Sequence, residues 1–152
     1  EVLLKLLDDY RLSHTYLFTA IPHIFISKTN PLASKKSIKL SDLVDFPYLS
    51  YEQGIHNSFY FSEEILSQEH HKKSIVVSDR ATLFNLLIGL DGYTIATGIL
   101  NSNLNGDNIV SIPLEYDDEI ELVYIKHEKA VLSDINEKFI EFLLEEVKFD
   151  KI

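Results

Sequence analysis

Polar side chains suited to holding a small ligand directly follow two short apolar runs: Ser78, Asp79, Arg80 and Thr97. The runs, residues 75–77 and 93–96, have the β-branched and aromatic composition of buried strands. The intervening leucines recur at helical spacing, so the whole stretch predicts a parallel strand pair joined by a helix. Ligands of open α/β sheets bind outside the carboxyl ends of the strands, which is where these residues fall. A structural role without any ligand is the plainer interpretation of such a unit.

A second candidate site is a polar turn at residues 52–57 that leads into a predicted helix at 58–66. Asn57 or Ser58 can cap that helix, and its free first-turn amides form a small anion site that Ser50 and Gln53 could extend. Simple capping explains the same residues.

Motifs of known catalytic chemistry are absent from the sequence: it has no phosphate-binding P-loop, dinucleotide glycine fingerprint, nucleophile elbow or helical zinc motif. His70 and His71 are adjacent and would point about 100° apart on a helix, so a surface loop is favoured over a metal site. We therefore expect no enzyme activity, no metal and no cofactor.

Composition narrows the class of protein further. The 152 residues carry a formal net charge of −10, which argues against a nucleic-acid surface, and Lys35, Lys36 and Lys39 read as a solvated loop. No apolar run approaches the ~20 residues that a membrane-spanning helix needs, so we expect a soluble protein. The lack of cysteine suits a reducing cytoplasm. The lack of methionine, with a start inside a helical pattern, suggests a fragment of a longer chain.

The remaining elements follow from periodicity. We expect an amphipathic helix ending near residues 10–11, strands at 15–19, 22–27, 48–51, 109–112 and 119–126, and a one-turn helix at 41–44. Ser133 should cap a last helix with an apolar stripe formed by Ile135, Phe139, Phe142, Leu143 and Val147. Gly92 should supply the left-handed turn after the helix that begins near Arg80.

Four segments in order, residues 22–33, 41–51, 77–97 and 121–143, resemble the effector-binding domain of LysR-type transcriptional regulators. The resemblance implies an α/β, periplasmic-binding-protein-like (type II) fold of two subdomains, with the second complete and the first partial. Residues 1–33 would be a remnant of the first subdomain and a crossover strand, 34–110 the second subdomain, and 111–152 the return strand and C-terminal helix. Ser50, Tyr51, Gln53, Asn85 and Thr97 occupy positions from which this family reaches its ligand; Tyr51 and Asn85 are named on the resemblance alone.

The resemblance also implies a function. The domain would sense a small-molecule effector in the cytoplasm, form a homodimer or tetramer, and act on DNA only through an N-terminal winged helix-turn-helix that this sequence lacks. Two alternatives stay open: an extracytoplasmic solute-binding protein of similar fold, and a small enzyme that depends on a carboxylate or on His56.

Overall fold

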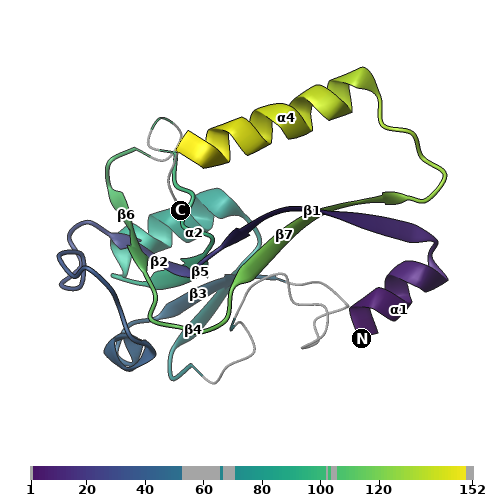
Figure 1. Ribbon diagram of the computed structural model, residues 1–152. Coiled ribbons are helices and arrows are strands. Elements are labelled where there is room, and N and C mark those ends of the chain that lie inside the picture. Colours follow the sequence, from purple (N-terminus) through teal and green to yellow (C-terminus); the bar gives the residue numbers. More distant parts are fainter. Residues whose placement is uncertain (1, 53–65, 67–70, 102, 104–105, 150–152) are drawn as a thin grey trace. The chain divides into compact units, whose positions relative to one another are not determined.

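The computed structural model describes residues 2–52, 66, 71–101, 103 and 106–149. The chain is a mixed α/β protein that divides into two compact units, Glu1–Ala20 with Ile120–Ile152, and Ile21–Glu119 (Figure 1). Both units are built around β-sheet, and the candidate site residues that the structure describes all fall in the second unit. The subdomain boundaries expected at residues 33/34 and 110/111 stay a prediction.

The larger unit contains a five-stranded sheet in the order β4-β3-β5-β2-β6. Its strands are β2 (His23–Ser27), β3 (Tyr48–Tyr51), β4 (Ser74–Val77), β5 (Tyr93–Ala96) and β6 (Ile109–Pro113). Strand β3 is parallel to β4 and β5, whereas β2 is antiparallel to β5 and β6. The predicted strand pair is therefore parallel, but its members are not neighbours, because β3 lies between them.

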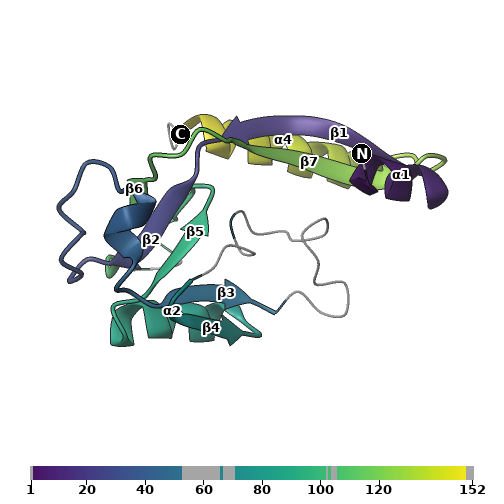
Figure 2. The ribbon, with the colours of Figure 1, turned by 90° about the horizontal axis from the view of Figure 1, so that it is seen from below.

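Helix α2 (Arg80–Gly89) connects β4 to β5 and covers one face of the sheet. Leu83 and Leu87 are fully buried on that face with Leu49, and Figure 2 shows the helix against β3 and β4. Leu90, which the sequence pattern assigned to the same stripe, is 48% exposed because it stands past the last helical residue.

The turn after α2 corrects the expectation for Gly92. Asp91, with φ 51°, adopts the left-handed conformation there. Gly92 is needed for space instead, since a Cβ on it would lie 2.9 Å from the Leu49 side chain and 3.1 Å from the Pro47 carbonyl oxygen.

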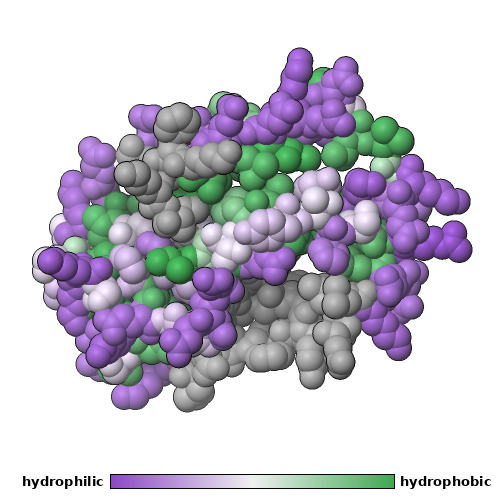
Figure 3. All heavy atoms as spheres, in the orientation of Figure 1, coloured by the Kyte–Doolittle hydropathy of each residue, from purple (hydrophilic) through white to green (hydrophobic). Residues whose placement is uncertain are grey.

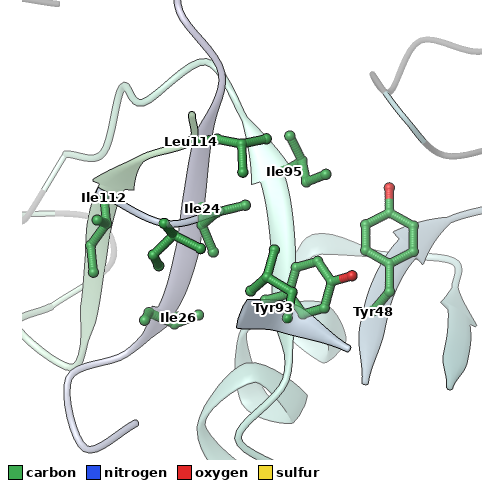
Figure 4. Close-up of a cluster of buried hydrophobic side chains, with 9 residues drawn as sticks. Ile24, Ile26, Tyr48, Tyr93, Ile95, Ile112 and Leu114 are labelled. Carbon is green, nitrogen blue, oxygen red and sulfur yellow. The ribbon is translucent and has the colours of Figure 1, made fainter. Parts of the chain in front are cut away.

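The opposite face of the sheet carries the larger apolar cluster, which includes Ile24, Tyr48, Tyr93, Ile95 and Ile112 (Figure 4). The one-turn helix expected at residues 41–44 is the 3-10 helix η1 (Leu40–Leu43). Its buried Leu43 belongs to this cluster.

Two of the three clustered lysines are paired with acids. Lys35 Nζ lies 2.8 Å from Asp42 Oδ1, and Lys39 Nζ lies 3.6 Å from Glu115 Oε2. The hydrogen bond from Lys35, with a second from the Lys39 backbone N–H, lowers the pKa of the Asp42 carboxyl below its ordinary value. These pairs leave little net positive charge in the loop.

In its described residues, 2–20 and 120–149, the smaller unit is a two-stranded antiparallel ribbon with two helices. It contains α1 (Val2–Asp9), β1 (Leu12–Ala20), β7 (Ile120–His127) and α4 (Asp134–Phe149). Strand β1 pairs with β7 along its length, with a register shift between Tyr16 and Phe18. Helix α4 begins after Ser133 as predicted, and Ser133 Oγ accepts a hydrogen bond from the Asn136 N–H at 3.4 Å.

The apolar stripe of α4 is exposed. Ile135, Phe139 and Phe142 are 78%, 64% and 58% exposed. Figure 3 shows hydrophobic residues along one side of this helix and hydrophilic residues along the other. The helix is confirmed, but the described residues do not cover its predicted apolar face.

Candidate functional site

The carboxyl ends of β3, β4 and β5 meet at one edge of the larger sheet. Tyr51 is level with Val77 in the β3–β4 register, and Tyr48 is paired with Tyr93 in the β3–β5 register, which sets Tyr51 level with Ala96. The polar residues that end or follow these strands are therefore neighbours: Ser50, Tyr51, Ser78, Asp79 and Thr97. This arrangement is the one that the open α/β rule anticipates for a ligand site.

Strand alternation divides these residues between the two sides of the sheet. Tyr51 packs with the cluster beneath α2, whereas Ser50, at 7% exposure, follows Tyr48 onto the opposite side. Thr97 is half-buried just past β5. By this alternation, Ser50 and Thr97 belong to the same side of the sheet at this edge, and Tyr51 belongs to the other side.

Asp79 is the N-cap of α2. Its Oδ1 accepts a hydrogen bond from the Thr82 N–H at 2.9 Å, and its Oδ2 accepts one from the Thr82 hydroxyl at 2.7 Å. These two hydrogen bonds, the backbone one first, lower the pKa of the Asp79 carboxyl. Capping explains the residue fully, and a ligand role for Asp79 stays a prediction.

Arg80 and Asn85 lie together in a groove beside α2 with a volume of about 720 Å³. The helix contributes positions Arg80, Ala81, Phe84, Asn85 and Ile88, and the chain beyond β5 contributes Ile99, Asn101 and Ile109. The Arg80 guanidinium carbon is 4.7 Å from the centre of the Phe84 ring, and that ring stands edge-on to Phe25 at 6.4 Å. The groove is separate from Ser50, Tyr51, Asp79 and Thr97, none of which lines it.

Sequence reasoning missed this groove. The sequence predicts a strand-end role for Arg80, and the resemblance implies a ligand role for Asn85. The apolar walls of the groove come from residues nearly thirty positions apart along the chain. The spacing Arg80, Phe84, Ile88 was the available signal, because residues four apart share one side of a helix.

A second cavity, of about 390 Å³, lies on the other side of the sheet and is bordered by His71, Lys72, Tyr93 and residues of η1. The His71 ring stacks on Tyr48 at 4.0 Å between centres. Its Nε2 is 3.2 Å from the Leu66 carbonyl oxygen and its Nδ1 is 3.0 Å from the Tyr93 hydroxyl. A carbonyl only accepts, so Nε2 carries a proton; when Nε2 holds the ring's one proton, the Tyr93 hydroxyl donates to Nδ1.

This packing corrects the surface-loop expectation for His71. The ring is partly buried and held at both nitrogens, and burial raises the pKa of Tyr93 to about 12. Within the described ranges, no cluster of three or more metal-ligating side chains is found. None of the helices in the part of the chain that the structure describes is both long and apolar enough to cross a bilayer.

Gln53, Asn57 and Ser58, together with His56, His70 and the helix expected at residues 58–66, lie outside the described residues apart from Leu66. Their predicted roles stay predictions.

Known proteins match this chain in structure but not in sequence. No family model and no curated protein matches the chain by sequence. By structure the chain is similar to a LysR family regulator, PA01 protein of Pseudomonas aeruginosa, with TM-score 0.66 and 14% identity over 91% of this chain and 50% of that one.

Two effector complexes also match. The effector-binding domain of QuiR with shikimate has TM-score 0.58 and 18% identity over 91% of this chain and 66% of that one. The effector-binding domain of BenM with its effector benzoate has TM-score 0.60 and 19% identity over 90% of this chain and 63% of that one. The chain spans about half the length of the first of these regulators. The expected fold class, periplasmic-binding-protein-like α/β, is confirmed.

Proposed function

We propose that the chain is the ligand-sensing part of a LysR-type regulator and that its effector binds at the carboxyl edge of β3, β4 and β5. The observation that carries the proposal is the fold, which this chain shares with regulatory domains whose structures contain shikimate and benzoate. The strand-end edge adds support, because it gathers hydroxyl groups from separate strands of the larger unit.

The effector would be held through hydroxyls and amides. Ser50 and Thr97 belong to the same side of the sheet at this edge. Gln53, Asn57 and Ser58 follow β3 in the sequence. Hydroxyls and backbone amides suit a small organic acid, an amino acid or a sugar. Tyr51 would contribute from the side of the sheet that faces α2.

Signalling would be a population shift. An effector that binds one geometry of the domain or dimer more tightly than another changes the populations by the ratio of its two affinities. In the whole protein this shift would alter DNA binding by an N-terminal winged helix-turn-helix, in a cytoplasmic homodimer or tetramer. The chain would bind its effector without converting it.

The experiment is a thermal-unfolding screen of the purified chain with small organic acids, benzoate, shikimate and 2-phosphoglycolate among them. A true effector raises the unfolding temperature with concentration, and ligand at a hundredfold excess over Kd adds about 2.7 kcal/mol. The variant Thr97→Val removes one hydroxyl at nearly constant shape, while Thr15→Val, at an exposed position of β1, is the matched control.

Thr97→Val should weaken the affinity for the stabilising compound about tenfold, which is the effect of one lost hydrogen bond. Thr15→Val should leave that affinity unchanged. NMR of the hit after prolonged incubation should show the ligand intact. Product formation would favour the enzyme alternative, and a screen in which no compound stabilises the chain would contradict the proposal.

A further inference from the structure

The groove beside α2 has the composition of a ligand site but no assigned role. Its helical lining recurs every fourth residue, at Arg80, Phe84 and Ile88, next to the stripe of Leu83 and Leu87 that packs on the sheet. The groove therefore has a rigid wall, since the buried leucines fix the orientation of the helix. Its volume of about 720 Å³ lies within the range of about 300–1,000 Å³ typical of small-molecule pockets.

The groove walls are mostly apolar. Phe84 and Ile88 come from the helix, and Ile99 and Ile109 come from the chain on either side of the loop before β6. Ile88 is 43% exposed although it belongs to this apolar surface. Contact with an apolar body would remove that surface from water, which is favourable.

The polar groups of the groove are a cation and two neutral amides. Arg80 supplies a cation, Asn85 and Asn101 supply amides, and none of the described residues that line the groove is acidic. This composition contrasts with a chain whose formal net charge is −10. Because the Arg80 guanidinium rests on the Phe84 ring at 4.7 Å, its direction is set before any ligand arrives.

We propose that this groove binds a small organic anion with an apolar body. Its carboxylate or sulfonate would pair with Arg80, with an amide from Asn85, and its apolar part would lie on Phe84 and the isoleucines. The site is additional to the strand-end edge, and the proposal stands independently of the proposed function. It assigns Arg80 and Asn85 to the groove rather than to the effector site.

The test uses octanoate, with octan-1-ol as a neutral probe of similar length, and follows binding by NMR of the backbone amides and by calorimetry. Octanoate should shift amides of residues 80–88 and 99–109. Arg80→Gln should weaken octanoate about tenfold, because a charge-assisted hydrogen bond is lost, and leave octan-1-ol unchanged. Lys36→Gln, which removes an exposed positive charge elsewhere, should change neither.

A second pair of variants tests the apolar wall. Ile88→Glu places a like charge in the groove and should abolish octanoate binding, whereas Leu90→Glu, on an exposed residue outside the groove, should not. Thermal unfolding of each variant checks that the fold is kept.

Three results would overturn the proposal. The first is an equal loss of octanoate and octan-1-ol in Arg80→Gln, which would remove the role of charge. The second is octanoate binding of undiminished strength in that variant. The third is a set of shifts confined to the second cavity, near residues 40–46 and 71–72.

Discussion

Gly98 lies directly against the ring of His23: a Cβ on Gly98 would stand 2.6 Å from His23 Nδ1 and 2.8 Å from Cγ. The ring itself is held, because Nδ1 is also 2.9 Å from the Ile21 carbonyl oxygen. Gly98 has φ +88°, a conformation that other residues rarely adopt. It is the residue after Thr97, so this close approach fixes the chain at the predicted effector edge.

The first prediction concerns this contact. Gly98→Ala should destabilise the chain by about 1–3 kcal/mol, because it adds both backbone strain and a clash with His23. Urea unfolding measures the loss. Gly106→Ala is the matched control, since Gly106 also has a positive φ, +67°, but no atom of the described residues lies within 4 Å of its added Cβ. Equal losses in the two variants would show that the His23 contact contributes nothing.

The second prediction concerns Asn30, which is 4% exposed. Its Nδ2 donates to the Asp91 carbonyl oxygen at 3.1 Å, and its Oδ1 accepts from the Leu32 N–H at 2.9 Å. The side chain thus ties the loop after β2 to the left-handed turn before β5. Asn30→Ala should cost about 1–3 kcal/mol, because it removes both hydrogen bonds of a buried side chain.

The control for that substitution is Asn136→Ala, at an exposed position of α4, which should leave the urea midpoint unchanged or slightly higher. If Asn30→Ala behaves like the control, the hydrogen bonds to Asp91 and Leu32 do not hold the loop.

Local order could be predicted from the sequence, because it depends on neighbouring residues. The apolar run before Ser78 and the leucine spacing predict β4 and α2 within a residue or two. The strands β2, β3, β5 and β6 followed from composition and turn residues in the same way.

Long-range placement could not be predicted. Nothing local to β3 says that it enters between β4 and β5, and only the pairing partners decide this. The groove joins Ile88 to Ile99 and Ile109, and the packing of His71 depends on Tyr48 and Tyr93. These contacts are set by the completed sheet rather than by any segment alone.

The third prediction is a pH dependence at the cap of α2. The pKa of Asp79 is lowered in the folded chain, chiefly by the Thr82 N–H, so its ionised form is favoured on folding. This stability is present above the ordinary aspartate pKa of 3.8 and is lost as the pH falls through the lower folded value. Asp79→Ala should therefore be less stable than the parent at pH 7.

Urea midpoints of the parent and of Asp79→Ala between pH 2 and pH 7 test the sign. The difference between the two proteins should shrink as the pH falls below about 4. A difference that stays constant over this range would mean that the charge of Asp79 has no part in capping.

The fourth prediction concerns Tyr93, whose pKa is raised to about 12 by burial. The folded chain keeps this hydroxyl protonated above the ordinary value of 10.0, so the stability it contributes is present below pH 10 and is lost as the pH rises toward 12. Tyrosinate absorbance near 295 nm follows the ionisation. The chain has eight tyrosines, so the parent spectrum is compared with that of Tyr93→Phe.

The difference between the two titrations should be one tyrosine ionising near pH 12. Tyr93→Phe also removes the hydroxyl that is hydrogen-bonded to His71 Nδ1, so it should weaken the fold at pH 7 while abolishing the loss of stability between pH 10 and 12. If the difference spectrum instead titrates near pH 10, Tyr93 is open to water. The second cavity, which Tyr93 borders with His71, would then be wetter than its packing implies.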